Sequence, residues 1–337
     1  MNDNKKLTVS ASPHIKAAET TRSIMSDVLI ALLPALIWAI YAFGWRAMTV
    51  TLITVFSCII FEYLFEKLMK KPVTVLDMSA AVTGVLLAFT LPVNVPLWLP
   101  VMGSFFAIVI VKQLFGGIGK NVVNPAIAAR IFLFIAWPSR LTSYVIPVAA
   151  KISPFTVSCG DIGDVTAKAT LLQSLKAGNS PDSTIFDMFL GNVAGSLGEI
   201  SAVLLIMGGI YLLIRKVITW HIPVAFIGTV AVITFIFPQA GSMQAYEFML
   251  SELLSGGLIL GAFFMATDYV TSPATKSGRL IYGIGCGAIT VFIRYFGGYP
   301  EGVSFGIMIM NLLVWYIDKF TRPKPFGAVK VPKEKKA

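Results

Sequence analysis

Ten apolar stretches, most of them close to the length of a membrane-spanning helix, run through this sequence. A spanning α-helix needs roughly 20 mostly apolar residues. Hydrophobic residues make up 56% of the 337 residues and charged residues only 13%, whereas about 25% of a soluble domain is charged. We therefore predict an all-α polytopic membrane protein with about ten transmembrane helices. The stretches lie at residues 24–43, 48–66, 78–91, 97–112, 124–137, 197–214, 221–237, 249–266, 279–295 and 304–320.

The third and fifth stretches, 78–91 and 124–137, are short for a membrane span. Glycine and proline surround them, in DMSAAVTGVLLAFTLPVNVP and FGGIGKNVVNPA. Short apolar segments interrupted by these residues are typical of broken helices that line a binding site. We therefore expect broken helices at these two positions.

Basic residues are unevenly distributed among the loops that join the stretches. The first, third, seventh and ninth loops hold only Arg46. Cytoplasmic loops collect lysine and arginine, so both termini and the even-numbered loops are predicted to be cytoplasmic, with the fifth loop outside. This topology explains the net charge of +10 without a nucleic-acid partner. The even-numbered loops hold Lys67, Lys70, Lys71, Lys112, Lys120, Arg215, Lys216, Lys276 and Arg279.

Cysteine and histidine are too few and too dispersed to predict a metal site. Cys58, Cys159 and Cys286 lie far apart without a CxxC pair, and the two histidines are His14 and His221. We therefore expect no iron–sulfur cluster or structural zinc held by this chain alone. The N-terminus also lacks the short apolar run and small-residue cleavage site of a secretory signal peptide.

The two halves of the sequence share a spaced motif. In TLPVN…FGGIGKN and in TSPAT…FGGYPEG, a proline (Pro92 or Pro273) precedes a Phe-Gly-Gly triplet by 23 residues. Each half has five stretches, and an odd number inverts the second copy, so we predict two inverted five-helix repeats. Such a repeat predicts a ligand, ion or cofactor pocket between the halves. Gly116 and Gly117 would let the backbone approach a ligand, or would only allow tight helix packing.

Polar residues at the ends of the apolar stretches are candidates for this pocket, because ionisable groups are costly in a membrane. Arg130 and Arg294 would either neutralise an anionic cofactor or reach the membrane surface. Asp268 lies in MATDYVTSP, where a stretch runs into a break, and would otherwise cap a helix. The candidate residues of the two halves are Gly116, Gly117, Asn121, Asn124, Arg130, Asp268, Thr271 and Arg294. An asparagine among them would donate to a ring carbonyl or cap a helix.

Four segments of the chain resemble the NqrB/RnfD family of membrane proteins. They are SPHIKAAETTRSIMSDVLIALLPA, DMSAAVTGVLLAFTLP, KQLFGGIGKNVVNPA and GAFFMATDYVTSPATKSGRLIYGIGCGAITVFIRYFGGYPEGVSFGIMIMN. The resemblance covers nearly the whole chain. It is greater to the RnfD subunits of Rnf ion-translocating ferredoxin:NAD oxidoreductases than to NqrB of sodium-pumping NADH:quinone oxidoreductases, because NqrB has a longer N-terminal extension.

The resemblance implies a covalent flavin in the polar stretch GDVTAKATLLQ, residues 163–173. In this family, FMN is linked by a phosphoester to a threonine at the end of a Ser/Thr-Gly-Ala-Thr motif with an acidic residue at its head. The matching text here is DVTAKAT, so Asp164 is the acidic residue and Thr170 the acceptor, with Thr166 as the alternative. Ala167 and Lys168 depart from the motif. Lys168 would balance the charge of the phosphodiester.

The family resemblance also implies a function for the whole chain. It would be a membrane relay between subunits that hold iron–sulfur clusters and a second covalent FMN, in a translocase that moves Na⁺ or H⁺. A second flavin, a non-covalent riboflavin, is implied near the cytoplasmic side by the likeness to NqrB. The implied location is the bacterial inner membrane. A flavin-free solute channel or transporter fits the inverted repeat alone equally well, and remains an alternative together with an NqrB-like subunit.

The sequence therefore divides into five predicted regions. They are a cytoplasmic N-terminal segment, a first membrane repeat, an outer loop with the FMN attachment site, a second membrane repeat and a basic cytoplasmic tail. Their residues are 1–23, 24–137, 138–196, 197–320 and 321–337.

Overall fold

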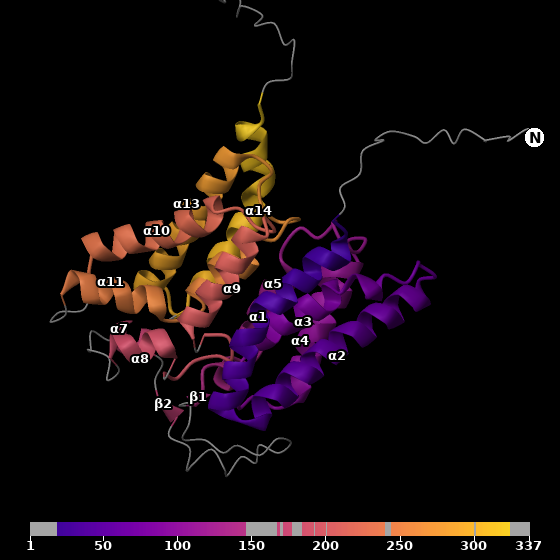
Figure 1. The fold of residues 1–337 in the computed structure, drawn as a ribbon, viewed down its shortest axis with the longest axis horizontal. Coiled ribbons are helices and arrows are strands. Elements are labelled where there is room, and N and C mark those ends of the chain that lie inside the picture. Colours follow the sequence, from indigo (N-terminus) through magenta and orange to yellow (C-terminus); the bar gives the residue numbers. More distant parts are fainter. Residues whose placement is uncertain are drawn as a thin grey trace, which may run out of the picture.

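The computed structural model describes residues 19–145, 167–168, 171–176, 184–191, 193–199, 201–239, 244–299 and 301–323. Its regular structure is helical apart from one antiparallel pair of two-residue strands, β1 (Tyr144–Val145) and β2 (Ala167–Lys168) (Figure 1). The first half contains α1 (Thr21–Phe43), α2 (Trp45–Leu68), η1 (Val75–Asp77), α3 (Ser79–Phe89), α4 (Trp98–Phe105), η2 (Phe106–Gln113), α5 (Pro125–Ala136) and α6 (Pro138–Leu141).

The second half follows two short helices, α7 (Leu171–Lys176) and α8 (Ile185–Leu190). Each of the ten predicted stretches overlaps one helix or a run of two or three consecutive helical elements. The elements of the second half are α9 (Ala202–Ile214), α10 (His221–Ile236), α11 (Ala245–Leu254), α12 (Leu258–Leu260), η3 (Gly261–Met265), α13 (Lys276–Phe296) and α14 (Val303–Thr321).

Four helices, α1, α2, α13 and α14, are long and apolar enough to cross a membrane, and a bent pair raises the number to five. The prediction of a helical membrane protein is confirmed. The prediction of ten spans and an inverted repeat stays a prediction, because the other apolar helices have only 10–17 residues. Helix α3, for example, has 11 residues and is about 17 Å long, shorter than a hydrocarbon core of about 30 Å.

The bent pair consists of α11 and the segment Leu258–Met265, which meet at 63°. The break falls inside the predicted stretch 249–266, where we did not expect one. Ser255 is extended and ends α11, and Gly256 has a φ of +67°. This left-handed conformation favours glycine, so the Ser-Gly-Gly sequence at 255–257 causes the break.

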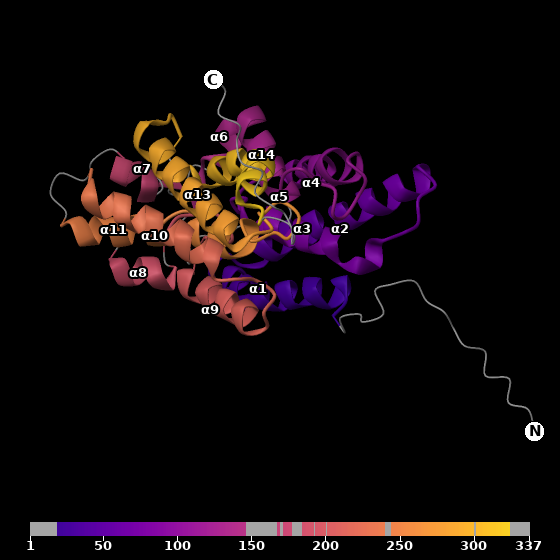
Figure 2. The same cartoon turned by 90° about the horizontal axis from the view of Figure 1, so that it is seen from above.

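The two halves lie side by side and share an apolar core. Figures 1 and 2 show α1–α5 on one side and α9–α14 on the other. The halves meet where α1 contacts α9 and where α5 contacts α14. One continuous cluster of buried apolar side chains draws on both halves, including Leu32, Leu86, Ile127, Phe264 and Ile307. Because lipid is as apolar as these side chains, close van der Waals packing, and not exclusion of water, holds the halves together within a membrane.

Arg46, the one basic residue in the first, third, seventh and ninth predicted loops, has a structural role. Its side chain is 1% exposed. Its guanidinium donates to the carbonyl oxygens of Val93 (3.4 Å) and Val95 (2.6 Å). These bonds satisfy the backbone in the break between α3 and α4, where helical hydrogen bonds are absent.

The contact between α1 and α9 depends on Gly208. A Cβ atom at this position would lie 2.3 Å from the carbonyl oxygen of Ala31, which is far inside van der Waals contact. We therefore expect Gly208→Ala to force the helices apart and to lower the free energy of unfolding by about 1–3 kcal/mol. The measurement is the midpoint of thermal unfolding of the purified chain.

Gly228→Ala is the matched control. Gly228 lies in α10, and a Cβ atom there would meet no atom within 4 Å. Replacing a helical glycine by alanine without a clash stabilises by about 0.5–1 kcal/mol. Equal unfolding midpoints for the two variants would contradict the close contact between α1 and α9.

Candidate cofactor sites

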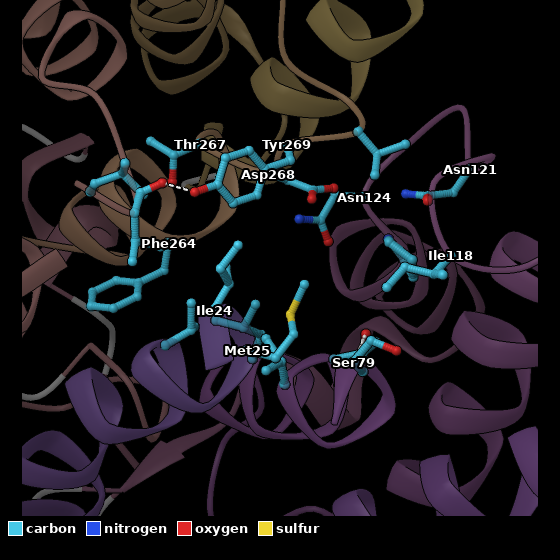
Figure 3. A pocket seen from close by; sticks show the side chains of 18 of the residues that line it. Ile24, Met25, Ser79, Ile118, Asn121, Asn124, Phe264, Thr267, Asp268 and Tyr269 are labelled. Carbon is cyan, nitrogen blue, oxygen red and sulfur yellow. Dashed lines mark hydrogen bonds between the residues drawn. The ribbon is translucent and has the colours of Figure 1, made fainter. Parts of the chain in front are cut away.

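A cavity of about 100 Å³ lies between the two halves, and we call it the interhalf cavity. It is reached by side chains of α1, α3 and η2 from the first half and of α9 and the segment after η3 from the second. Figure 3 shows Ile24 and Met25 facing Asn124 and Asp268 across it. A lining of mostly apolar side chains with a few polar groups is typical of a small-molecule or cofactor site.

At this cavity, the side chain of Asn124 makes hydrogen bonds to both halves of the chain. Its side-chain oxygen accepts from the backbone N–H groups of Ala126 (3.0 Å) and Ile127 (3.4 Å), so it caps α5. Its amide nitrogen donates to the carbonyl oxygen of Met265 (3.2 Å), at the end of η3. Asn121 also lines the cavity, and its amide donates to the carbonyl oxygen of Val123 (3.2 Å). The helix-capping interpretation therefore holds for Asn124.

Asp268 lies in the turn that follows η3 and lines the same cavity. The hydroxyl of Thr271 donates to its carboxylate (3.1 Å). Burial raises the pKa of Asp268, and the hydrogen bond from Thr271 opposes this rise. The two residues thus form one polar group at the wall of the cavity, with Thr271 behind Asp268.

A buried ion pair adjoins the interhalf cavity at Lys112, on η2. The ammonium lies 2.5 Å from Glu62 Oε1 and 2.7 Å from the hydroxyl of Ser79. Gln113 donates to Glu62 (3.0 Å) and to Glu66 (3.3 Å). The three charged side chains are at most 3% exposed. The group contains two carboxylates and one ammonium, so its formal charge is negative.

Gly116 and Gly117 lie in the turn after η2. Their φ angles are +116° and +91°, which L side chains rarely adopt. They are absent from the lining of the interhalf cavity. Their conformation therefore shapes the turn that leads to Asn121.

Arg130 and Arg294 lie apart from the interhalf cavity. Each forms an ion pair with a carboxylate of this chain. Arg130 pairs with Glu301. Arg294 lies 2.7 Å from Glu252 and also donates to backbone carbonyls at 252 and 255. Both arginines are 3% exposed. The structure thus gives each a protein anion as its partner.

The predicted attachment residues lie mostly outside the described residues, and these include Asp164 and Thr170. The backbone of Lys168 is described, and it pairs with Tyr144 in the register of β1 and β2. Leu171 follows Thr170 in the sequence and lines a second, smaller cavity together with Tyr144 and Glu199. The described segment after Thr170 therefore lines this second cavity, and the one before it pairs with a strand that does.

Three buried charged residues were missed as site candidates, namely Glu62, Glu66 and Lys112. We counted Lys112 only as a loop charge. The signal was available, because Glu62 and Glu66 lie four residues apart within an apolar stretch. Carboxylates on one helix face inside a membrane are costly and usually functional.

Among the described residues, no group of three or more histidine, cysteine, aspartate or glutamate side chains could hold a metal ion. The described cysteines, Cys58 and Cys286, are buried and free. The polar groups of the two cavities are instead amides, hydroxyls and carboxylates, together with the ammonium of Lys112.

The sequence model of the NQR2, RnfD, RnfE family matches residues 8–327. The chain belongs to this family. Relatives in the family match it from end to end. A protein from Acetobacterium woodii, named as a subunit of the Na(+)-translocating ferredoxin:NAD(+) oxidoreductase complex, is 48% identical over 335 residues, covering 98% of each chain.

Two further relatives carry related names. A Clostridium ljungdahlii protein, named as a subunit of the proton-translocating ferredoxin:NAD(+) oxidoreductase complex, is 40% identical over 95% of this chain and 96% of its own length. An Escherichia fergusonii protein, named as a subunit of the ion-translocating oxidoreductase complex, is 35% identical over 95% of this chain and 98% of its own length. The names of the first two relatives specify different ions, so membership of the family does not fix the ion.

Proposed function

We propose that this chain is the RnfD subunit of an ion-translocating ferredoxin:NAD oxidoreductase complex, a translocase of the bacterial inner membrane. The observation that carries the proposal is the end-to-end match to relatives named as a subunit of such a complex, at up to 48% identity. A role inside a complex also agrees with the sequence, which has neither an iron–sulfur motif nor a nucleotide-binding GxGxxG motif. Its partners would be the subunits that hold the iron–sulfur clusters and a second covalent FMN.

We further propose that FMN is attached to Thr170 through a phosphoester. The motif DVTAKAT supports this assignment, with Asp164 at its head and Lys168 beside the acceptor. Leu171 and Leu172 of α7, which follows Thr170 in the sequence, line the second cavity, and β2, which precedes it, pairs with β1, whose Tyr144 also lines that cavity. FMN carries one or two electrons at a time, which suits a relay between one-electron clusters and two-electron carriers. The chain itself would supply the attachment point of the FMN and would hold the FMN in position.

Thr170→Val is expected to abolish covalent flavin fluorescence of the denatured chain on a gel, because valine has no hydroxyl to form the ester. Thr166→Val is the matched control and should keep the fluorescence. Lys168→Gly should also keep it, since Lys168 is proposed to stabilise the bound phosphate and not to form the bond. Fluorescence that survives in Thr170→Val and disappears in Thr166→Val would reject the assignment.

The interhalf cavity is the proposed site of a second, non-covalent flavin, a riboflavin. Its side chains suit this group, since Phe263, Phe264 and Met25 offer apolar contacts while Asn121 and Asp268 offer polar ones. These residues would bind and orient the ring system. The chemistry of the lining, apolar side chains with a few polar groups, supports the assignment, but the volume of about 100 Å³ is below the roughly 300–1,000 Å³ of ordinary ligand pockets, so the cavity would have to widen to admit the ring system.

The inverted repeat is proposed on two observations. Adding 181 to the residue numbers of α1, α3, α4–η2 and α5 brings each onto a helix or broken helix of the second half. The contacts between the halves join equivalent elements, α1 with α9 and α5 with α14, as a pseudo-twofold axis requires. The positive-inside rule then supports cytoplasmic termini and an outer-side attachment loop.

A further inference from the structure

The second cavity holds a group of ionisable side chains that the proposed relay does not use. Its lining includes Tyr144, Glu199, Ser255 and Glu301. These residues come from β1, from the turn before α9, from the break after α11 and from the segment before α14. The cavity thus lies where the segment that joins the two halves meets the second half.

The carboxylates of Glu199 and Glu301 both lie next to Gly257. A Cβ atom at Gly257 would lie 3.1 Å from Glu301 Oε1 and 3.4 Å from Glu199 Oε1. Both carboxylate groups therefore approach the same point, and the missing side chain of Gly257 leaves room for them. The two oxygens therefore lie no farther apart than the sum of these two distances, 3.1 and 3.4 Å, and like charges at such a separation in a buried site raise the pKa of one carboxyl unless a cation compensates.

The cations that the structure describes around this point are too few for the carboxylates. Arg130, on α5, pairs with Glu301. Arg294, on α13, lies 3.3 Å from the Cβ position of the neighbouring Gly256, but it is paired with Glu252 of α11 at 2.7 Å. Among the side chains that the structure describes, two guanidinium groups thus face three carboxylates, which leaves one negative charge in excess.

Glu199 carries this excess charge. Its Oε2 accepts a hydrogen bond from the backbone N–H of Ser196 (3.2 Å), and this bond brings no positive charge. Tyr144 lines the same cavity as Glu199 and is 5% exposed. Burial raises the pKa of its hydroxyl, so Tyr144 is neutral and does not alter the balance.

Two buried polar atoms at the same place lack hydrogen-bond partners among the described residues. They are Arg130 Nη1 and the hydroxyl oxygen of Ser255. Arg130 is 3% exposed and Ser255 is 6% exposed, and Ser255 lines the cavity. An unsatisfied buried polar group is costly, so these atoms indicate a site that is built to bind something small and polar.

We propose that Glu199 and Glu301 form a carboxyl pair that binds one exchangeable proton. One positive charge bound at this pair would balance the three carboxylates against the two guanidinium groups. A proton is the smallest cation that carries one charge. A sodium ion is the other monovalent cation that would balance it, and the experiment below separates the two. The site needs no flavin, so it stands apart from the assignment of Thr170.

The acidity of Glu199 agrees with this geometry. Burial, and after it the charge of Glu301, raises the pKa of Glu199 to about 7, against the opposing effect of Arg130. A proton with this affinity exchanges near neutral pH, where an ordinary glutamate is fully ionised.

The test is infrared difference spectroscopy of the purified full-length chain, titrated between about pH 5 and pH 9 in buffer without sodium. The wild-type chain is expected to lose one protonated-carboxyl band with a midpoint near the pKa of about 7. Glu199→Gln and Glu301→Gln should each abolish this titration, because either change breaks the pair. Glu247→Gln, which removes a carboxylate hydrogen-bonded to the exposed Tyr246, should leave it unchanged.

A second measurement uses the wild-type chain and does not depend on the folding of a variant. Dicyclohexylcarbodiimide reacts with protonated carboxyl groups, so labelling of the pair should fall about tenfold between pH 6 and pH 8. Mass spectrometry locates the label. A band that persists in both variants, or labelling that does not change with pH, would overturn the proposal. Labelling suppressed by Na⁺ but not by K⁺ would also overturn it, because the pair would then be a sodium site.

Discussion

Arg130→Met is expected to lower the free energy of unfolding by about 3–5 kcal/mol, because it removes one partner of a buried ion pair. Arg130 is 3% exposed and pairs with Glu301 across a separation of 171 residues. Without the guanidinium, Glu301 and Glu199 would remain together with no cation of their own. The measurement is the midpoint of thermal unfolding of the purified chain, which should fall by roughly 5–10 °C.

Arg215→Met is the matched control for this prediction. Arg215 also forms an ion pair, with Asp27 at 3.1 Å, but its side chain is 51% exposed. Exposed pairs contribute about 0–1 kcal/mol, so its loss should change the midpoint little. In Arg130→Met with Glu301→Gln, part of the lost stability should return, since the unpaired charge is gone. An Arg130→Met chain as stable as Arg215→Met would refute the role of this pair between the halves.

Lys112→Met should be destabilising for the same reason at the other buried ion pair. The ammonium of Lys112 lies 2.5 Å from Glu62, and Glu66 lies close to both through Gln113. The change leaves two buried carboxylates without a cation, at an expected cost of about 3–5 kcal/mol. Thermal unfolding again gives the measurement.

Lys67→Met supplies the comparison for Lys112. Lys67 is an exposed residue of α2, and its ammonium lies 5.8 Å from the ring centroid of Tyr63. An exposed cation–π contact contributes about 0.5–1 kcal/mol. Lys112→Met with Glu62→Gln should recover part of the stability that Lys112→Met alone loses. Identical midpoints for Lys67→Met and Lys112→Met would show that the buried pair is not a stabilising contact.

The helices of this fold are readable from the sequence because apolar stretches in a membrane must satisfy their backbone hydrogen bonds internally. All ten predicted stretches overlap helical segments. The short stretches 78–91 and 124–137 become the short helices α3 and α5. The break within 249–266 was missed, because three small residues at 255–257 are a weak signal beside the apolar residues around them.

The candidate site was predictable in part. Asn121, Asn124 and Asp268 come together at one cavity, as expected for polar residues at broken helices. The partners of Arg130 and Arg294 were not predictable, because Glu301 and Glu252 lie far from them in sequence and no local pattern encodes such pairs. Lys112 was misjudged for a similar reason, since its burial depends on Glu62 of a neighbouring helix.

The most direct test of the proposed function is mass spectrometry of the tryptic peptides around Thr170, from protein made in its native host. Trypsin cleaves after lysine, so Thr170 is released in the peptide 169–176, in which it is the only threonine. Thr166 is released in a different peptide, 152–168. We predict an FMN adduct on peptide 169–176. An unmodified peptide 169–176, with or without an adduct on 152–168, would contradict attachment at Thr170.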